Sequence, residues 1–546
     1  MGRPHVFATG ATVCALALTA TACSSGADES GDGTGRKGGS VSVAVQQAWS
    51  GFNPHTPDQG NNAGLAISNA IYPSAFNVQP NQTVKLNSDL LVSATSVSTN
   101  PQTIEYKIKP SAVWSDGKPI TGADFTYLWQ HSNGKDKKLQ VSSTIGYSQI
   151  KSVTSEGDGK TVRVVFDKPF ADWKSLFDGL LPAHFMKTLG NDADAWNKGL
   201  AKKIPPSGGP FSIAENRPDQ YIEFQRNPKW YGKPANPDKV TLRLIEDNQA
   251  VVQALASGEV DVASLEATRA LIGQVKAVSG VKSTVVPTTS MNFLNFQHKD
   301  PVIKDVAVRR AIATVVQPEQ VAKTVIGDGY EKLLTNNFIY SPASADYSDE
   351  RPASFGTGDV AAAKKILESA GYRAGGDGIY AKNGTKLIFN YVVTPGDQID
   401  QVTSVLFQDT FKKIGMKLEI KSVPVNKAFD VLMAGEYSTT FGGYPDSDFP
   451  VSWYSALYTC DGGYNLGRFC DPAVDTLYNE ANTALDPKRQ AEVVKQLNKK
   501  LWEDVANIPL WMRPLLVVTT ERVSGVTTDI PTNWILHNAT QWSVAR

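Results

Sequence analysis

Residues 205–265 read PPSGGPFSIAENRPDQYIEFQRNPKWYGKPANPDKVTLRLIEDNQAVVQALASGEVDVASL, and they form the most informative segment of the chain. Its residue pattern predicts a regular alternation of turns, strands and one helix. In order these are a Gly/Pro turn (208–210), two alternating strands (211–214 and 221–225), a loop rich in Pro, Trp and Tyr (227–238), a third strand (240–245), a helix that ends at Gly258, and a short buried strand (260–265). A glycine directly after the last apolar helical position is a usual helix stop.

Four motifs in this stretch stand at fixed spacing: Gly-Gly-Pro-Phe at 208–211, Arg-Asn-Pro followed by Trp-Tyr-Gly at 226–232, Asp-Lys-Val at 238–240, and Ser-Gly-Glu-Val-Asp at 257–261. Together they resemble the central signature of the family 5 extracellular solute-binding proteins, the oligopeptide- and dipeptide-binding class that feeds ABC importers. A second block resembles another signature of that family: it runs from Trp114 to Trp129, and Thr121 and Asp124 have the spacing of a helix capping box.

The resemblance implies a two-lobed α/β clamshell of the periplasmic-binding-protein class, with an extra β-rich subdomain in the first lobe. The length of 546 residues also favours two or more lobes, because single cores rarely grow so large. We expect lobe I over 41–288 with its β-rich subdomain at about 74–204, lobe II over 289–510, and a return to lobe I over 511–546. Crossings between the lobes are expected near 286–292 and 510–520.

The first forty residues are predicted to direct export. Arg3, the apolar run 6–18 and the small residues 20–22 form a signal peptide over 1–22 that resembles a lipoprotein signal, with Cys23 as the acylated residue. The alternative is an ordinary secretory signal with a chance cysteine. Residues 23–40 are rich in Ser, Gly and Asp and predict a flexible tether. We therefore expect a protein anchored by lipid at the outer face of a bacterial cell membrane.

Composition excludes several other classes of protein. The 54 basic and 54 acidic residues balance, and no basic block suggests a nucleic-acid partner. Once the signal is removed and Cys23 carries lipid, Cys460 and Cys470 remain, and a disulfide between them is the simplest expectation in an exported protein; two unpaired thiols are the alternative. The histidines are scattered, so we expect neither a metal site nor a cofactor.

The strongest candidate ligand site is the loop GGYPDSDFP at 442–450, which is followed by an aromatic run at 453–458. Small residues admit a ligand to the backbone, aromatic rings supply flat walls, and a carboxylate can receive an ammonium group. In the dipeptide-binding members an Asp of this loop binds the α-ammonium, and Asp446 occupies that position, with Asp448 as the fallback; Gly443 stands where the family has Trp. Tyr444, Trp453, Trp49, Asn292 and Phe293 complete the candidate substrate-binding residues. The alternatives are an Asx-turn at Asp446 and core packing for the aromatic residues.

The function that the resemblance implies is capture of short peptides between two lobes and their delivery to the permease subunits of an ABC importer, by a protein that is not an enzyme. Oligosaccharides, nickel chelates or other small solutes are alternative ligands, and a lipoprotein receptor for a peptide signal is an alternative role. A secreted hydrolase is the alternative from another class, but the sequence holds no GxSxG, HExxH or P-loop motif. We expect a monomer.

Overall fold

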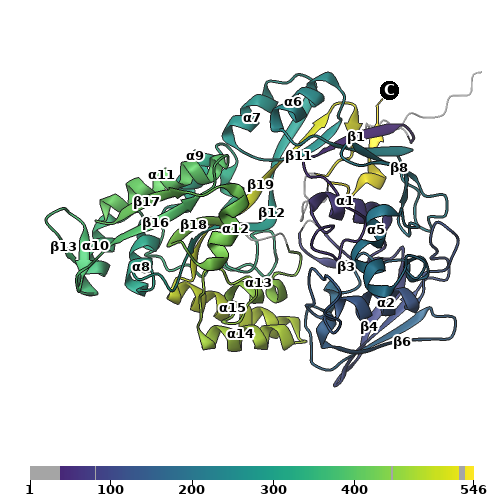
Figure 1. The fold of residues 1–546 in the computed structure, drawn as a ribbon, viewed down its shortest axis with the longest axis horizontal. Coiled ribbons are helices and arrows are strands. Elements are labelled where there is room, and N and C mark those ends of the chain that lie inside the picture. The colour runs from purple at the N-terminus through teal and green to yellow at the C-terminus, as the bar shows by residue number, and fades with distance from the viewer. Residues whose placement is uncertain (1–36, 80, 444–446, 528–534, 546) are drawn as a thin grey trace, which may run out of the picture. The chain divides into compact units, whose positions relative to one another are not determined.

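A computed structural model of the chain describes residues 37–79, 81–443, 447–527 and 535–545, which form a mixed α/β fold (Figure 1). Its largest element is a ten-stranded sheet. In order across the sheet the strands are β17 (Lys417–Ser422), β16 (Ile388–Val393), β18 (Thr439–Gly443), β12 (Val281–Phe296), β19 (Asn507–Thr520), β11 (Val262–Glu266), β1 (Ser40–Val45), β10 (Lys239–Leu244), β9 (Tyr221–Arg226) and β8 (Phe211–Arg217). No helix among these residues is long and apolar enough to span a bilayer.

The two strands at the middle of the sheet, β12 and β19, join its two halves. They are antiparallel partners from Val281 opposite Thr520 to Asn295 opposite Asn507. The sequence predicts separate strands at 281–286 and 291–296, but the structure has one strand whose register shifts after Pro287. Proline lacks the N–H that a ladder requires, so pairing is interrupted there while the strand continues.

A second, antiparallel sheet has the order β4 (Leu91–Thr99), β5 (Gln102–Ile108), β7 (Thr161–Phe166) and β6 (Ile150–Glu156). Helix α2 (Gly122–Ser132) packs on it and begins with the predicted capping box. The Thr121 side chain accepts a hydrogen bond from Ala123 N, and Asp124 Oδ2 accepts one from Thr121 N. Asp124 is buried, and this desolvation raises the pKa of its carboxyl to about 6.

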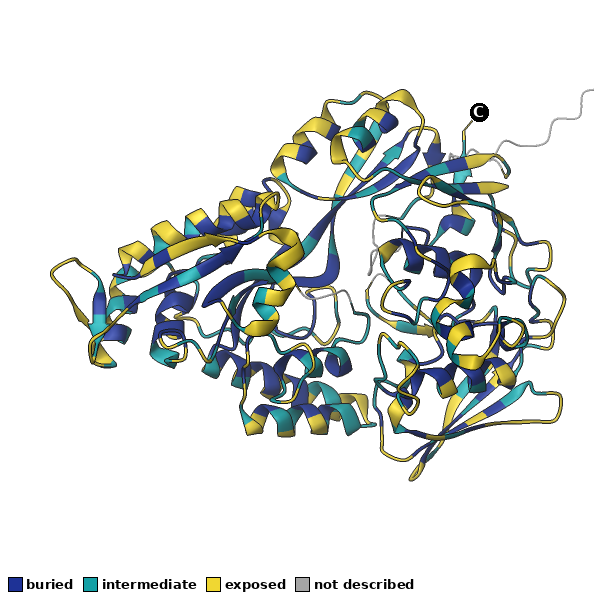
Figure 2. Ribbon diagram, viewed as in Figure 1, coloured by how far each residue is buried: buried dark blue, intermediate teal, exposed yellow. Residues whose placement is uncertain are grey.

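Buried apolar side chains form two large clusters, which we call the first core and the second core. The first core contains mostly residues between Val41 and Val262, together with C-terminal residues such as Trp542. The second core contains mostly residues between Val251 and Leu510. Strand β19, which is buried along most of its length (Figure 2), serves both: Leu515 and Val517 belong to the first core, and Leu516 and Val518 to the second. Because side chains alternate between the two faces of a strand, one strand can contribute buried side chains to both cores.

Helices surround both cores and expose their outer faces (Figure 2). Besides α2 they are α1 (Asn62–Ile71), α3 (Ala183–Met186), α4 (Asp192–Asp194), α5 (Leu200–Lys202), α6 (Asn248–Ser257), α7 (Arg269–Lys276), α8 (Val306–Val315), α9 (Pro318–Val325), α10 (Val360–Ser369), α11 (Gln398–Lys413), α12 (Val425–Ala434), α13 (Pro450–Tyr458), α14 (Pro472–Thr483) and α15 (Pro487–Asp504). Short strands pair locally: β2 (Phe76–Val78) with β3 (Val84–Leu86), β14 (Tyr380–Lys382) with β13 (Arg373–Ala374) and β15 (Thr385–Lys386), and β20 (Val523–Ser524) with β21 (Ser543–Val544).

The Gly-Gly-Pro-Phe turn at 208–211 binds the C-terminal end of helix α1. The backbone N–H groups of Gly208 and Gly209 both donate to the carbonyl oxygen of Ile71, at 2.9 Å each. A Cβ atom on Gly209 would lie 2.6 Å from the carbonyl oxygen of Ala70, so only glycine allows this approach. Asn227 also stabilises this turn, because its Nδ2 donates a hydrogen bond to Gly209 O at 2.8 Å.

The last motif of the stretch, Ser-Gly-Glu-Val-Asp, fixes strand β1 beside β11. Gly258 closes helix α6 with φ of 73°, the left-handed conformation that favours glycine. Asp261 is buried, and its Oδ2 accepts a hydrogen bond from Ser42 N on β1 at 2.8 Å. Arg522 binds the same carboxylate through its Nε at 2.7 Å, so the buried charge is compensated.

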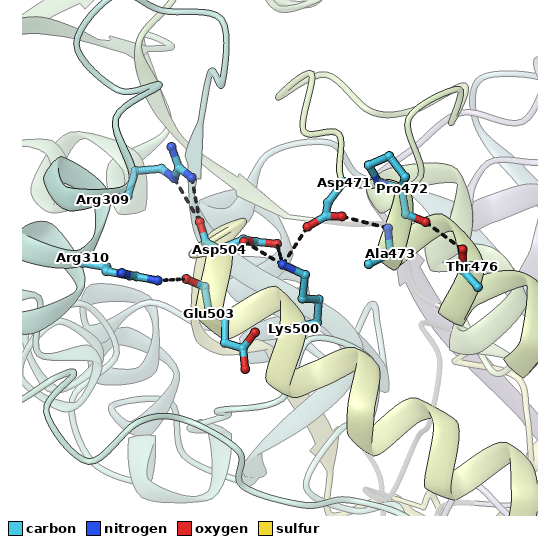
Figure 3. A network of polar contacts seen from close by, with 9 residues as sticks. All are labelled: Arg309, Arg310, Asp471, Pro472, Ala473, Thr476, Lys500, Glu503 and Asp504. Carbon is cyan, nitrogen blue, oxygen red and sulfur yellow. Dashed lines mark hydrogen bonds and ion pairs between the residues drawn. The ribbon is translucent and has the colours of Figure 1, made fainter.

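A network of charged side chains joins helices of the second core at one end of α15 (Figure 3). Lys500 Nζ lies 2.7 Å from Asp471 and 3.0 Å from Asp504, while Arg309 donates to the carbonyl oxygen of Asp504. Asp471 also caps helix α14 by accepting from Ala473 N. The hydrogen bond from Lys500 lowers the pKa of Asp471, so the ion pair favours the charged carboxylate. The network fixes the helices on which part of the candidate site rests.

Candidate ligand-binding groove

Helix α1 forms one wall of the candidate site and is fixed at both ends. At its start the Asn61 side chain accepts a hydrogen bond from Gly64 N at 2.9 Å, and at its end the Gly208–Gly209 turn binds Ile71. Asn62, Ala66 and Asn69 follow one another by one helical turn and share one face of the helix. Residues of this face line two cavities, and a third cavity adjoins one of them.

The first cavity has a volume of about 240 Å³ and lies at the start of α1. Four of its polar residues, Gln46, Gln47, Asn62 and Ser264, are uncharged, and two, Glu266 and Arg513, are charged. The apolar part of the lining comes from Ala44, Val45, Ala63, Ala66, Leu515 and Ile535. Residues of β1, β11, β19 and α1 thus meet in one place.

The second and third cavities, of about 230 Å³ each, adjoin one another. Both are lined by Leu176 and Asp178 from the first-core side and by Ser447 and Phe449 from the loop before α13. The third cavity also touches Asn69, so it lies further along the same face of α1 as the first. We call the three cavities together the α1 groove.

Glu266, one of the two charged residues that line the first cavity, is the last residue of β11. Strands β1, β10 and β11 are parallel, and ligands often bind outside the carboxyl ends of parallel strands. Desolvation raises the pKa of Glu266, the Arg513 guanidinium lowers it, and Asp397 at the start of α11 raises it further. The upward effect of desolvation and of Asp397 on the pKa of Glu266 is together larger than the downward effect of Arg513.

Two side-chain N–H donors in the rest of the groove have no partner within the described part of the chain. These buried atoms are Nδ2 of Asn69, which lines the third cavity, and Nε1 of Trp453, which lines the second. A buried donor left without a hydrogen bond costs about 1–3 kcal/mol. A ligand that offers acceptors along the groove would recover this free energy.

One contact beside the second cavity joins the two cores. Asp172 precedes the short turn 173–175, and its two carboxylate oxygens accept from Ser452 N at 3.1 Å and from Gln490 Nε2 at 3.2 Å. Next to it, Ala171 N donates to the carbonyl oxygen of Asn482 at 2.8 Å. Helices α13, α14 and α15 therefore all contact this turn.

Two of the substrate-binding residues expected from the sequence line the groove. Asp448 lines the third cavity and Trp453 the second, where its ring lies 5.8 Å from that of Tyr464. Asp446 and Tyr444 lie outside the described residues, as does Cys23. Contact of Asp448 and Trp453 with a ligand stays a prediction.

The other three expected residues, Trp49, Asn292 and Phe293, line none of these cavities. Trp49 is buried in the first core, where its Nε1 donates to Asn216 Oδ1 at 2.9 Å. Asn292 and Phe293 are buried in β12 opposite Gly443 and Gly442 of β18. A Cβ atom on Gly443 would lie 2.8 Å from Asn292 Oδ1, so the Asn292 side chain fills the space beside this glycine.

Sequence reasoning missed Glu266, Arg513, Asn69 and the contribution of α1. A lone charge inside the apolar run around Arg513 is one signal, because such a residue needs a polar environment. The position of Glu266 at the carboxyl end of a buried strand is another. No local pattern identifies Asn69, since its role depends on the loop near Ser447, far away in the sequence.

The sequence also led us to expect a disulfide and no metal site. Cys460 and Cys470 are joined by a disulfide in the structure. Among the described residues no group of three or more His, Cys, Asp or Glu side chains is arranged to hold a metal ion. The lining of the groove consists of hydrogen-bonding groups, aromatic rings, apolar side chains and a few charges.

Comparisons with known proteins agree on one family. The profile described as "Bacterial extracellular solute-binding proteins, family 5 Middle" matches residues 85–465. The oligopeptide-binding protein OppA of Mycobacterium tuberculosis (strain ATCC 25618 / H37Rv) is 28% identical over 489 residues, covering 87% of this chain and 80% of OppA.

Two solved structures are similar over almost their whole length. The periplasmic EDTA-binding protein EppA has a TM-score of 0.87 and 28% identity, covering 94% of this chain and 98% of EppA. The oligopeptide-binding protein AppA of Bacillus subtilis, in complex with a nonapeptide, has a TM-score of 0.75 and 22% identity, covering 94% of this chain and 100% of AppA. The fold is the two-lobed α/β fold of these proteins. The chain belongs to family 5 of the bacterial extracellular solute-binding proteins, which serve ABC importers.

Proposed function

We propose that this protein captures short peptides in the α1 groove and delivers them to the permease subunits of an ABC importer. The observation that carries the proposal is that Asn69 and Trp453 line cavities and that their buried N–H donors, Asn69 Nδ2 and Trp453 Nε1, have no partner among the described residues. Carbonyl oxygens recur along a peptide backbone and would satisfy such donors one after another.

The size and lining of the groove support a peptide of a few residues. Each cavity is below the range of about 300–1,000 Å³ that is typical of small-molecule sites, but the second and third share lining residues such as Leu176, Asp178 and Phe449. Phe449 and Trp453 supply apolar walls for side chains, and the polar groups hold the backbone. The names of OppA and of the AppA–nonapeptide complex support the same ligand class.

Several finer features belong to the same proposal. Asp446 accepts the α-ammonium of the peptide, with Asp448 as the fallback. The protein is a monomeric lipoprotein held by Cys23 at the outer face of the cell membrane. Lobe I spans 41–288 and 511–546 and lobe II spans 289–510, and the protein carries out no reaction on its ligand.

A metal chelate or other small solute is the second candidate. The name of EppA, whose structure has the TM-score of 0.87, supports it. EDTA is a polyanion, and a polyanion would meet Glu266 and Asp397 in or near the first cavity with Arg513 as the compensating charge. The excess of carboxylates there favours the peptide over an anionic chelate.

The proposal is tested by Trp453→Phe, which keeps the aromatic ring and removes the N–H donor. Calorimetric titration with alanine-based pentapeptides should show affinity weaker by about 1 kcal/mol, the usual net value of one hydrogen bond. Trp129→Phe is the matched control, because Trp129 Nε1 is also buried without a partner among the described residues but Trp129 lines none of the three cavities. Equal affinity for both variants and the parent contradicts a peptide carbonyl at Trp453.

A further inference from the structure

The first cavity has a chemical character of its own within the α1 groove. Glu266 and Arg513 are its charged lining residues, and the remaining polar lining consists of two glutamines, an asparagine and a serine. The second and third cavities are lined by residues 447 and 449, whereas the first is not. A group bound in the first cavity is therefore separate from one held by Asp448 or its neighbours.

Glu266 is exposed and lines the first cavity. The residues around its carboxylate nevertheless desolvate it enough to raise its pKa. Arg513 lies near enough to lower this pKa and Asp397 near enough to raise it. Of these three side chains two are acidic and one is basic, so a further cation would balance their charge.

We propose that the first cavity binds a basic side chain of the ligand, with Glu266 as the residue that contacts its cationic nitrogen. This inference rests on the proposed function and adds a preference to it: peptides that carry lysine or arginine at one position bind more tightly than neutral ones. Asp397 adds to the attraction from the start of α11, and Arg513 excludes a second cation from the same cavity.

The geometry of the groove explains why a side chain, and not the peptide's first residue, occupies this place. The α-ammonium is assigned to the loop 446–448, part of which borders the second and third cavities. The first cavity lies at the other end of the α1 face, at Asn62 and Ala66. An extended peptide that begins at the loop would bring a later side chain to Glu266.

The test uses alanine-based pentapeptides in which lysine or its neutral analogue norleucine occupies one position at a time. Calorimetric titration of the parent protein should show that lysine at one position tightens binding about tenfold to a hundredfold over norleucine, the gain of one charge-assisted hydrogen bond. Glu266→Gln should abolish this gain, so that the lysine and norleucine peptides bind the variant with equal affinity. Glu259→Gln is the matched control, because Glu259 lies outside the cavity and pairs with Arg243 at 3.4 Å.

Each other outcome overturns a defined part of the account. Equal affinity for lysine and norleucine peptides at every position, or a lysine gain that survives Glu266→Gln, overturns the basic-side-chain site and leaves peptide capture intact. A norleucine peptide whose affinity falls on N-acetylation in the parent but not in Glu266→Gln assigns the cation at Glu266 to the peptide's amino terminus and overturns the side-chain assignment. Failure of every peptide to bind overturns peptide capture and this inference with it. If Glu266→Gln does not fold, Asp397→Asn takes its place. Asparagine can still cap helix α11, and this variant should reduce the affinity gain of the lysine peptide over the norleucine peptide.

Discussion

The carboxylate of Asp172 accepts a hydrogen bond from the backbone N–H of Ser452, 3.1 Å away and 280 residues further along the chain. Ser452 lies in the first turn of α13, where backbone N–H groups have no partner within the helix. A residue beside the first core thus caps a helix of the second core. Because Trp453 and Phe449 flank this contact, it also fixes one wall of the second cavity.

Asp172→Ala should lower the free energy of unfolding by about 1–3 kcal/mol, because the N–H of Ser452 and the amide of Gln490 lose their acceptor. Urea denaturation measures this change. Asp167→Ala is the control, since Asp167 lies five residues earlier at the surface. Its free energy of unfolding should be close to that of the parent. Equal stability of both variants would show that the contact contributes nothing.

His298 should make the protein less stable in mild acid. Desolvation lowers its pKa to about 3, whereas an unfolded histidine has a pKa of about 6.5, so the unfolded chain binds an extra proton between these values. Stability therefore falls as the pH drops below about 6.5, and the loss should reach about 1–2 kcal/mol at pH 5.

His298→Gln keeps a donor for the carbonyl oxygen of Ala506 and removes the titration. The difference in unfolding free energy between parent and variant, measured by urea denaturation from pH 8 to about pH 4.5, should shrink as the pH falls. A constant difference across this range would contradict the assignment.

The bond between Cys460 and Cys470 should persist in the mature protein. Mass spectrometry of the unreduced protein should find the two residues linked, and two free thiols there would refute the expectation. Replacing both cysteines by serine should cost about 2–3 kcal/mol of stability, the value expected for closing a short loop. Calorimetric unfolding of the double variant measures that cost.

Asp446→Ala should weaken peptide binding by more than about 1.5 kcal/mol, because a charge-assisted hydrogen bond to the α-ammonium is lost. Asp448→Ala is the matched comparison, as Asp448 lies two residues away and lines the third cavity. A loss of affinity confined to Asp448→Ala moves the ammonium site to Asp448. Unchanged affinity in both variants removes the ammonium site from this loop.

Local sequence patterns predict much of the fold. The alternation at 103–108 predicts β5, and Thr121 with Asp124 predicts the start of α2, because both depend on neighbouring residues alone. The single long strand β12 escapes prediction, since Pro287 breaks the local pattern while pairing with β19 continues beyond it. The lobe boundaries stay a prediction.

The candidate site is less predictable because distant segments build it. Asp448 and Trp453 follow from the loop motif, and both line cavities. Asn69 and Glu266 do not follow from it, because their positions depend on the packing of α1 against strands from both ends of the chain. Trp49 shows the converse: an aromatic residue that the pattern suggests for the ligand packs in the first core.

The most direct test of peptide capture is the melting temperature of the soluble protein, residues 24–546, in the presence of di- to pentapeptides, sugars and metal chelates. A peptide at a hundred times its dissociation constant should stabilise the protein by about 2.7 kcal/mol, which is visible as a higher melting temperature. We predict that peptides raise the melting temperature and that sugars and chelates do not. A rise with a sugar or chelate alone would contradict peptide capture.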